Sequence, residues 1–148
     1  MKKVLYLHGL ESSQGGEKVE FLSSKAWVHA PEMDYENLNL HEFILTIGIP
    51  DLIIGSSMGG YIADIIGSRL GVDVLLFNPA LHSRDLSPKN RKIKNYDYFP
   101  NRYKRTIILG TEDDVVDPEL TKKLWSVHGN VAIIDEVEGM GHRTPLDV

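Results

Sequence analysis

Short runs of apolar residues alternate along this chain with longer segments in which apolar residues recur every three or four positions. An apolar run without alternation is typical of a strand covered on both faces, and the wider spacing is typical of a helix. Strands that alternate with helices predict a parallel sheet with right-handed crossovers. The predicted strands are residues 3–8, 27–33, 51–55, 72–80, 105–110 and 130–139. The second of them should end at Pro31.

Helical spacing marks several of the segments between these strands. The helix over 58–70 has its apolar residues on one stripe, and it is followed by Gly71, which can adopt the left-handed conformation at low cost. Asp117 is suited to cap a helix that opens at Pro118. The predicted helices lie within residues 12–25, 39–48, 58–70 and 118–129. The sequence therefore predicts a three-layer α/β/α sandwich around a mostly parallel sheet.

Composition limits the classes of protein to which this chain can belong. Its 148 residues suit one domain with a sizeable core, and 42% hydrophobic with 25% charged residues is typical of a soluble globular protein. The chain has no cysteine, which excludes disulfides, thiolate zinc sites and cysteine nucleophiles. No apolar run approaches the roughly 18 residues of a membrane span. The opening MKKVLYLHGL is too short for a signal peptide, so we expect a cytoplasmic protein.

Charge is distributed unevenly along the chain. The net charge of −5 argues weakly against a general binder of polyanions. Residues 84–105 contain eight basic and two acidic residues, so this segment carries +6 and the remainder −11. Aromatic residues are interleaved with these charges, as in segments that bind single-stranded nucleic acid. The preferred interpretation is a solvated excursion that covers the sheet, and a wall of a substrate pocket is a third interpretation.

The stretch GSSMG at residues 55–59 matches the pattern Gly-x-Ser-x-Gly, with Ser57 at its centre. This pattern is typical of a sharp turn between a strand and a helix, which holds the serine clear of the sheet as a nucleophile. The two glycines let strand and helix approach closely, and the helix N-terminus offers free N–H groups to an oxyanion. A P-loop would need Gly-Lys-Ser/Thr and a dinucleotide loop Gly-x-Gly-x-x-Gly, so both are excluded.

A nucleophilic serine needs a base, and the chain has six histidines. His142 follows the last predicted strand, at the carboxyl edge of the sheet where open α/β folds gather their sites. It also comes last in the order serine, acid, histidine. We therefore expect His142 to be the base. His8 is expected to fix the loop after the first strand by hydrogen bonds rather than to take part in the chemistry.

The base needs an acid that holds its tautomer, and residues 109–118 offer several carboxylates after a predicted strand. Asp113 is the preferred acid and Asp114 is the fallback. Asp117 is better explained as the helix cap, because a proline follows it. Without a serine and a histidine in suitable places, the same segment would be interpreted as an acidic turn.

An oxyanion hole needs two N–H donors beside the nucleophile. Leu10 follows the first strand and Met58 follows the serine, so their backbone N–H groups are placed to point at one spot. Each such donor is typically worth about 10²–10³-fold in rate.

Five motifs stand in series along the chain: YLHGL, GSSMGG, FNPA, GTEDDVV and GMGH. In this order they resemble the α/β-hydrolase superfamily, and within it the small capless bacterial esterases of the YqiA-like type (UPF0227). The resemblance covers nearly the whole chain and implies a minimal α/β-hydrolase fold as a single domain over residues 1–148. It also implies site residues: Ser57 as nucleophile, Asp113 as acid, His142 as base, and the N–H groups of Leu10 and Met58 as oxyanion donors.

The chain also departs from that superfamily. It is shorter than most hydrolases, and almost nothing follows His142, whereas a final helix normally braces that loop. No insertion is long enough to form a separate cap domain, so the segment 84–105 would have to shape the pocket. A shallow site without a cap favours small or short-acyl substrates.

These observations lead to three hypotheses. The first is a serine hydrolase that cleaves carboxylic esters, with thioesters or amides as variants, without cofactor or metal, and best at neutral to alkaline pH. Its partner is a small-molecule ester, no membrane or nucleic acid is expected, and the oligomeric state is left open. The second is a non-catalytic binding or scaffold protein that uses residues 84–105. The third is a metal enzyme using His8, Asp113 and His142, although no histidine pair has helical metal-binding spacing.

Overall fold

The computed structural model describes residues 1–10, 15–80, 103–127 and 132–148, and it leaves the side chains of 124–127 undescribed. Most of the segment 84–105, namely residues 84–102, lies outside the described residues. Its predicted roles therefore stay predictions.

Within the described residues, parallel strands form one sheet in the order β2-β1-β3-β4-β5-β6. The predicted parallel sheet is thus confirmed, and β5 has the predicted bounds. β2 is shorter than the predicted 27–33, because its pairing with β1 covers only three residues. The strands are β1 (Lys3–Leu7), β2 (Trp27–His29), β3 (Leu52–Ser56), β4 (Val74–Phe77), β5 (Arg105–Gly110) and β6 (Ala132–Val137).

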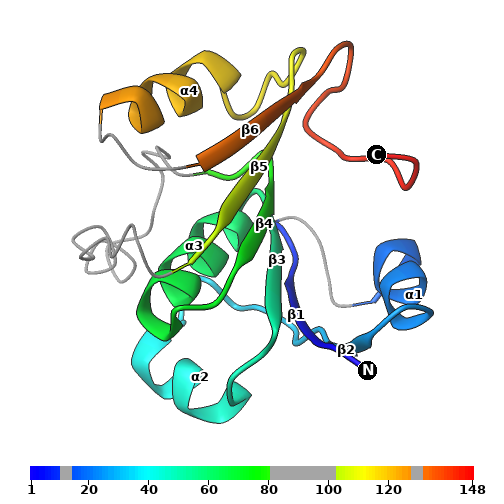
Figure 1. The fold of residues 1–148 in the computed structure, drawn as a ribbon, viewed down its shortest axis with the longest axis vertical. Coiled ribbons are helices and arrows are strands. Elements are labelled where there is room, and N and C mark those ends of the chain that lie inside the picture. Colours follow the sequence, from blue (N-terminus) through cyan, green and yellow to red (C-terminus); the bar gives the residue numbers. More distant parts are fainter. Residues whose placement is uncertain (11–14, 81–102, 128–131) are drawn as a thin grey trace.

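Helices cover both faces of the sheet, which confirms the predicted three layers. The helix α1 lies on one face, and α2, α3 and α4 lie on the other (Figure 1). Right-handed crossovers explain this division, because the step from β1 to β2 runs in the opposite direction to the later steps. None of these helices has the length and apolar character of a membrane span. The helices are α1 (Glu17–Ser23), α2 (Leu40–Ile47), α3 (Met58–Leu70) and α4 (Pro118–Val127).

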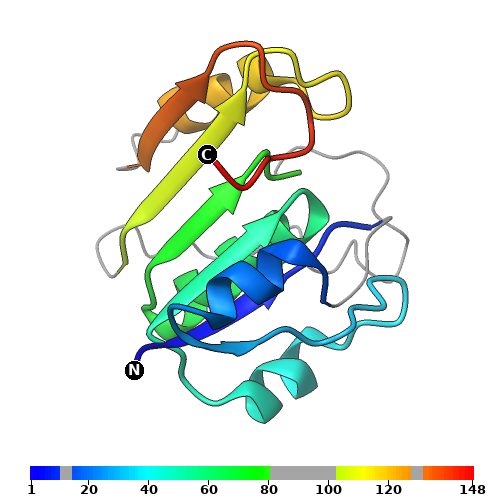
Figure 2. The ribbon, with the colours of Figure 1, turned by 90° about the vertical axis from the view of Figure 1, so that its right-hand side faces the viewer.

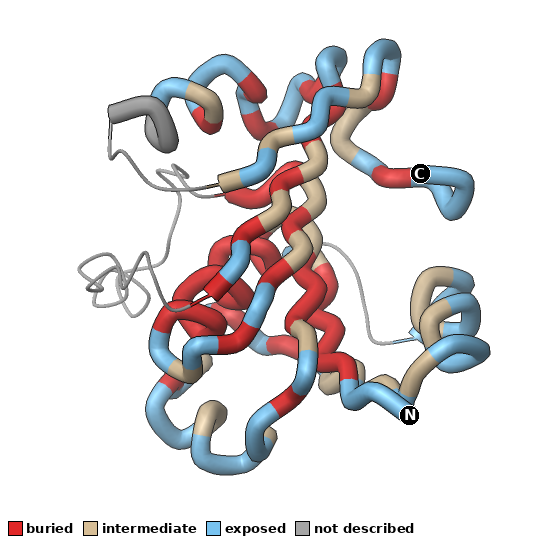
Figure 3. Tube along the Cα trace, viewed as in Figure 1, coloured by how far each residue is buried: buried red, intermediate tan, exposed pale blue. Residues whose placement is uncertain are grey.

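The larger hydrophobic core lies between the sheet and α3. This helix is buried on all sides from Met58 to Ser68 (Figure 3), whereas the sequence predicted a single apolar stripe. The difference arises because α3 also buries polar residues, among them Asp64, whose Oδ1 accepts a hydrogen bond from Arg105 Nε at 2.6 Å. A smaller core of Val4, Tyr6 and Ile54 packs beneath α1 on the other face.

The strand order makes the boundary between β1 and β3 different from the other positions of the sheet. From β1 the chain continues through α1 on one face, and from β3 it continues through α3 on the opposite face. The carboxyl ends of β1 and β3 are therefore neighbours from which the chain diverges, and open parallel sheets commonly place their sites at such a switch point. The GSSMG stretch and the loop at residues 8–10 both begin there.

Candidate active site

Ser57 occupies the sharp turn between β3 and α3. Its φ of 55° and ψ of −119° lie in a region that residues other than glycine rarely adopt, so the turn is strained. Backbone hydrogen bonds hold it there: Ser57 N–H donates to Phe77 O at 3.0 Å, and Ser57 O accepts from Ala80 N–H at 2.9 Å. The surroundings therefore determine the conformation that presents the serine hydroxyl.

The two glycines of the turn are required by the close approach of backbone segments. A Cβ atom on Gly59 would lie 2.1 Å from Leu7 O and 2.5 Å from His8 O. A Cβ on Gly55 would lie 2.3 Å from Gly59 O. No side chain fits at these distances, so the start of α3 can pack against β1 and β3 only with glycine at both positions.

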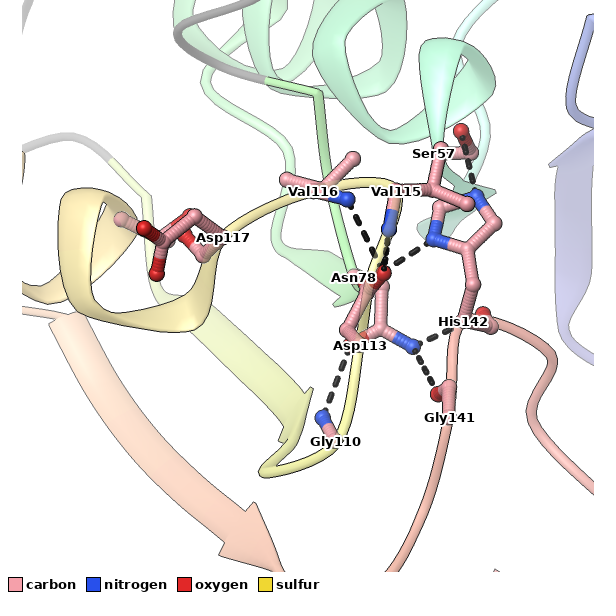
Figure 4. Close-up of polar contacts among 10 residues, drawn as sticks. Ser57, Asn78, Gly110, Asp113, Val115, Val116, Asp117, Gly141 and His142 are labelled. Carbon is pink, nitrogen blue, oxygen red and sulfur yellow. Dashed lines mark hydrogen bonds and ion pairs between the residues drawn. The ribbon is translucent and has the colours of Figure 1, made fainter.

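Ser57, His142 and Asp113 form a chain of hydrogen bonds at the carboxyl edge of the sheet (Figure 4). His142 Nε2 lies 3.0 Å from Ser57 Oγ, and His142 Nδ1 lies 2.9 Å from Asp113 Oδ2. An ionised carboxylate only accepts hydrogen bonds, so Nδ1 carries the hydrogen and Nε2 is free to accept from the serine hydroxyl. The structure thus brings together the three side chains that the sequence singled out.

The carboxylate of Asp113 is fixed by its own loop. Its Oδ1 accepts hydrogen bonds from the N–H groups of Val115 and Val116, both at 2.9 Å, which leaves Oδ2 facing the histidine. Asp114 is exposed and does not take this position. Asp117 Oδ1 accepts from Glu119 N–H at 2.9 Å, so its predicted role as the cap of α4 is confirmed.

Asn78 also belongs to this site, although sequence reasoning assigned it no role. It is buried directly after β4, its Nδ2 donates to Gly141 O at 3.2 Å and His142 O at 2.8 Å, and its Oδ1 accepts from Gly110 N–H at 2.8 Å (Figure 4). The FNPA motif was the only signal of its importance. Its partners lie too far away in the chain for spacing to reveal them.

The loop after β1 lies directly beside the serine. A Cβ on Gly9 would be 3.4 Å from Ser57 Cβ and 4.0 Å from Ser57 Oγ. The next residue, Leu10, is exposed, and Met58 is buried at the first position of α3. Leu10 and Met58, the residues predicted to supply the oxyanion donors, therefore each follow one of two residues that lie side by side, Gly9 and Ser57.

His8 is buried and bound into the loop, as the sequence predicted. Its Nδ1–H donates to Gly9 O at 2.6 Å, and its Nε2 accepts from Met33 N–H at 2.9 Å, which requires a neutral ring. The exposed Glu32 carboxylate lies farther away, 3.7 Å from Nε2. The Tyr35 hydroxyl donates to the carbonyl of His8, and burial raises the pKa of Tyr35, which keeps that donor protonated.

The metal set of the third hypothesis is not assembled. Both ring nitrogens of His8 are bound elsewhere, Nδ1 to Gly9 O and Nε2 to Met33 N–H, whereas His142 bonds to Asp113. In the described parts of the chain, no group of three or more histidine, aspartate or glutamate side chains is arranged to hold a metal ion.

Comparison with known proteins identifies the family. The model of the uncharacterised protein family UPF0227 matches residues 3–91, more than half of the chain. The chain belongs to the UPF0227 family. A UPF0227 protein of Vibrio cholerae is 29% identical over 144 residues, which cover 80% of this chain and 79% of the relative. A UPF0227 protein of Pasteurella multocida is 26% identical over 159 residues, with 91% and 88% covered.

Solved structures identify the fold of this UPF0227 protein. A Xanthomonas campestris protein assigned to the α/β hydrolase superfamily superposes with a TM-score of 0.71 at 18% identity, over 96% of this chain and 87% of that one. Esterase PE8 gives 0.61 at 18% identity, with 99% and 86% covered. An esterase domain from Rhodothermus marinus gives 0.67 at 13% identity, with 95% and 78% covered. The chain therefore has the α/β-hydrolase fold.

Proposed function

We propose that this UPF0227 protein is a serine hydrolase that cleaves carboxylic esters of small or short-acyl substrates through an acyl-serine intermediate. The observation that carries the proposal is the chain of hydrogen bonds from Ser57 through His142 to Asp113, on a strained turn. A nucleophile, a base within hydrogen-bond reach and an acid that orients the base are the parts that acyl transfer to a serine requires.

The proposed reaction begins when His142 Nε2 takes the proton of Ser57 Oγ as the oxygen attacks the ester carbonyl carbon. Asp113 holds the imidazole in the required tautomer and stabilises the imidazolium. The imidazolium then gives its proton to the departing alcohol, which leaves an acyl group on the serine. Water, deprotonated by the same nitrogen, attacks the acyl carbon. The imidazolium then returns that proton to the serine oxygen as the bond to the acyl carbon breaks, which releases the carboxylic acid and the free serine.

The N–H groups of Leu10 and Met58 are the proposed donors to the oxyanion of both tetrahedral intermediates. The position of Gly9 supports this assignment, because a Cβ on it would meet Ser57, and the loop after β1 therefore lies beside the proposed nucleophile. The N-terminus of α3 adds the positive end of its dipole at the same place. Each donor would contribute about 10²–10³-fold to the rate.

The choice of an ester as the substrate is part of the proposal. Solved structures with this fold include proteins named as esterases, although their low identity carries no substrate over to this chain. We place the function in a single hydrolase domain without a separate cap, which suits small acyl groups. Thioesters and small amides fit the same chemistry and are variants of the proposal.

The test is intact-mass spectrometry after incubation with a fluorophosphonate, which reacts with activated serines. Wild-type protein and Ser56→Ala should each gain one adduct, whereas Ser57→Ala should gain none; Ser56 is the matched control because it precedes the nucleophile. Hydrolysis of p-nitrophenyl esters of increasing acyl length would then define the acyl preference. Wild-type protein that is folded by circular dichroism but gains no adduct would contradict the proposal and favour a binding role on the same fold.

A further inference from the structure

The four residues from the last position of β4 onward, Phe77 to Ala80, bond to the backbone of Ser57 and to the segments that carry Asp113 and His142. The carbonyl of Phe77 and the N–H of Ala80 both bond to the backbone of Ser57. Between them, Asn78 N–H donates to Ile108 O at 2.9 Å, which ties the segment to β5. The end of this central strand is therefore fixed to the nucleophile on one side and to the strand before the Asp113 loop on the other.

The side chain of Asn78 continues these ties to the base. Its carbonyl oxygen holds Gly110 N–H, at the start of the loop that carries Asp113, and its amide nitrogen donates to Gly141 O and His142 O. One acceptor and two donors are needed at this point, and among residues of this size only asparagine supplies them. An aspartate would place a lone pair against two carbonyl oxygens.

The histidine loop depends on such ties. Residues 138–148 form no helix or strand, and they follow β6 along the side of the sheet on which α1 lies (Figure 2). A Cβ on Gly110 would lie 2.3 Å from Met140 O and 2.6 Å from Gly141 O, so the two loops are pressed together without side chains between them. Asn78 joins both loops at this contact, and the backbone of His142 is one of its partners.

We propose that Asn78 is a positioning residue: by binding the Asp113 loop and the His142 loop with one amide, it sets the distance from His142 to Ser57 and so controls how reactive the serine is. The residue touches none of the reacting atoms. Its effect on reactivity rests on the proposed serine hydrolase function, whereas its effect on the histidine ring does not.

Two variants separate the side chain from the backbone. Asn78→Asp keeps the shape and the acceptor for Gly110 N–H but replaces the donor to the two carbonyls. Asn78→Gly keeps the backbone, because glycine adopts the φ of 42° found here without strain, and removes only the side chain. Asn39→Ala is the matched control, because Asn39 accepts a hydrogen bond from Glu42 N–H as the cap of α2, and the bonds of Asn78 described above involve no residue of that helix.

The first measurement is the rate constant of fluorophosphonate labelling, corrected for the folded fraction of each variant. We expect both Asn78 variants to label about 10–100-fold more slowly than the wild type, the loss typical when a group that orients a functional ligand is removed. Asn39→Ala should lose stability through its helix cap and keep the wild-type rate within about twofold. Wild-type rates in both folded Asn78 variants would overturn the inference and leave Asn78 a purely structural residue.

The second measurement does not depend on hydrolysis. Nuclear magnetic resonance of histidine labelled with ¹⁵N, assigned with His142→Ala, reports the ring nitrogens and the Nδ1 proton shared with Asp113. This signal should shift or broaden in Asn78→Gly and stay unchanged in Asn39→Ala. An unchanged signal in Asn78→Gly would overturn the inference even if the wild type never labels. A changed signal together with an unreactive wild type would refute the hydrolase proposal alone.

Discussion

Asp113 and Asp114 are neighbours in the chain, but they lie in different surroundings. The Asp113 carboxylate is buried, bound by two backbone N–H groups and directed at His142, whereas Asp114 is exposed. Which of the two side chains is buried depends on how the backbone turns in the loop after β5. This dependence is the reason that the sequence left the two aspartates as alternatives.

Exchanging each aspartate for asparagine tests this distinction. In Asp113→Asn the new amide would donate to His142 Nδ1, which forces the hydrogen onto Nε2 and removes the acceptor for the serine proton. We expect kcat/KM for a p-nitrophenyl ester to fall by about 10³–10⁴-fold. Asp114→Asn should change it less than about twofold. A large loss in Asp114→Asn, with Asp113→Asn still active, would show that Asp114 and not Asp113 is the acid.

Residues of the candidate site that a local pattern marks could be predicted to meet there, and those whose place depends on distant partners could not. Ser57 stands in a motif that is typical of a sharp turn between a strand and a helix. His142 comes last in the order serine, acid, histidine and follows the last strand. Asn78 has neither, because its side-chain partners are 32, 63 and 64 residues away in the chain. Only a folded structure brings those partners together.

At the scale of elements, the turn from β3 into α3 is the most constrained. It depends on Gly59, where a Cβ would overlap two carbonyl oxygens of β1 and its loop, and backbone atoms cannot move aside as a flexible side chain can. The close packing of α3 against the end of β1 places Ser57 beside the loop at residues 8–10. A change at this glycine should therefore affect stability and reactivity together.

Gly59→Ala should lower the free energy of unfolding by about 3 kcal/mol, the upper end of the usual cost of overpacking, and should slow labelling of Ser57. Gly141→Ala is the matched control, because the nearest atom to its new Cβ is 4.0 Å away. It should change stability by less than about 0.5 kcal/mol. Urea unfolding of both proteins measures the difference, and equal midpoints would show that the close approach at Gly59 is absent in solution.

The elements themselves were largely predictable because their signals are local. Gly71 does end α3, with φ 68° and ψ 34°, and Asn39 and Gly48 flank α2 within the predicted segment. The burial of α3 on all sides from Met58 to Ser68 was not predictable, because it includes the buried pair of Asp64 and Arg105, which joins residues 41 positions apart. A hydrophobic pattern cannot reveal a buried polar partner.

At the scale of the whole molecule, strand order decides where the site lies. Alternating strands and helices predicted parallel pairing, but the order β2-β1-β3-β4-β5-β6 follows from packing between elements. The switch point between β1 and β3 then brings the loop at residues 8–10 to Ser57. Tyr35 secures that loop from a separate segment of chain, and it links the stability of the whole fold to pH.

Burial raises the pKa of Tyr35 above the ordinary value of 10.0, and Tyr6 and Glu32 nearby add to the effect. Above that pH the unfolded chain loses this proton while the folded chain keeps it, so stability present at neutral pH is lost as pH rises. The slope should be about 1.4 kcal/mol per pH unit for this tyrosine. Denaturant unfolding between pH 9 and 11 should show a shallower decline in Tyr35→Phe; equal slopes would contradict the expectation.

The separation of Ser57 from His142 by 85 residues has a consequence for synthesis. A nascent chain leaves the ribosome from its N-terminus, so the serine turn emerges long before His142, the proposed base. Until β6 pairs with β5 and carries the histidine loop to Asn78, the hydroxyl is an ordinary alcohol. Under the proposed function, Ser57 would therefore be unreactive in partly folded chains, and a reactive Ser57 would show that β6 has paired with β5.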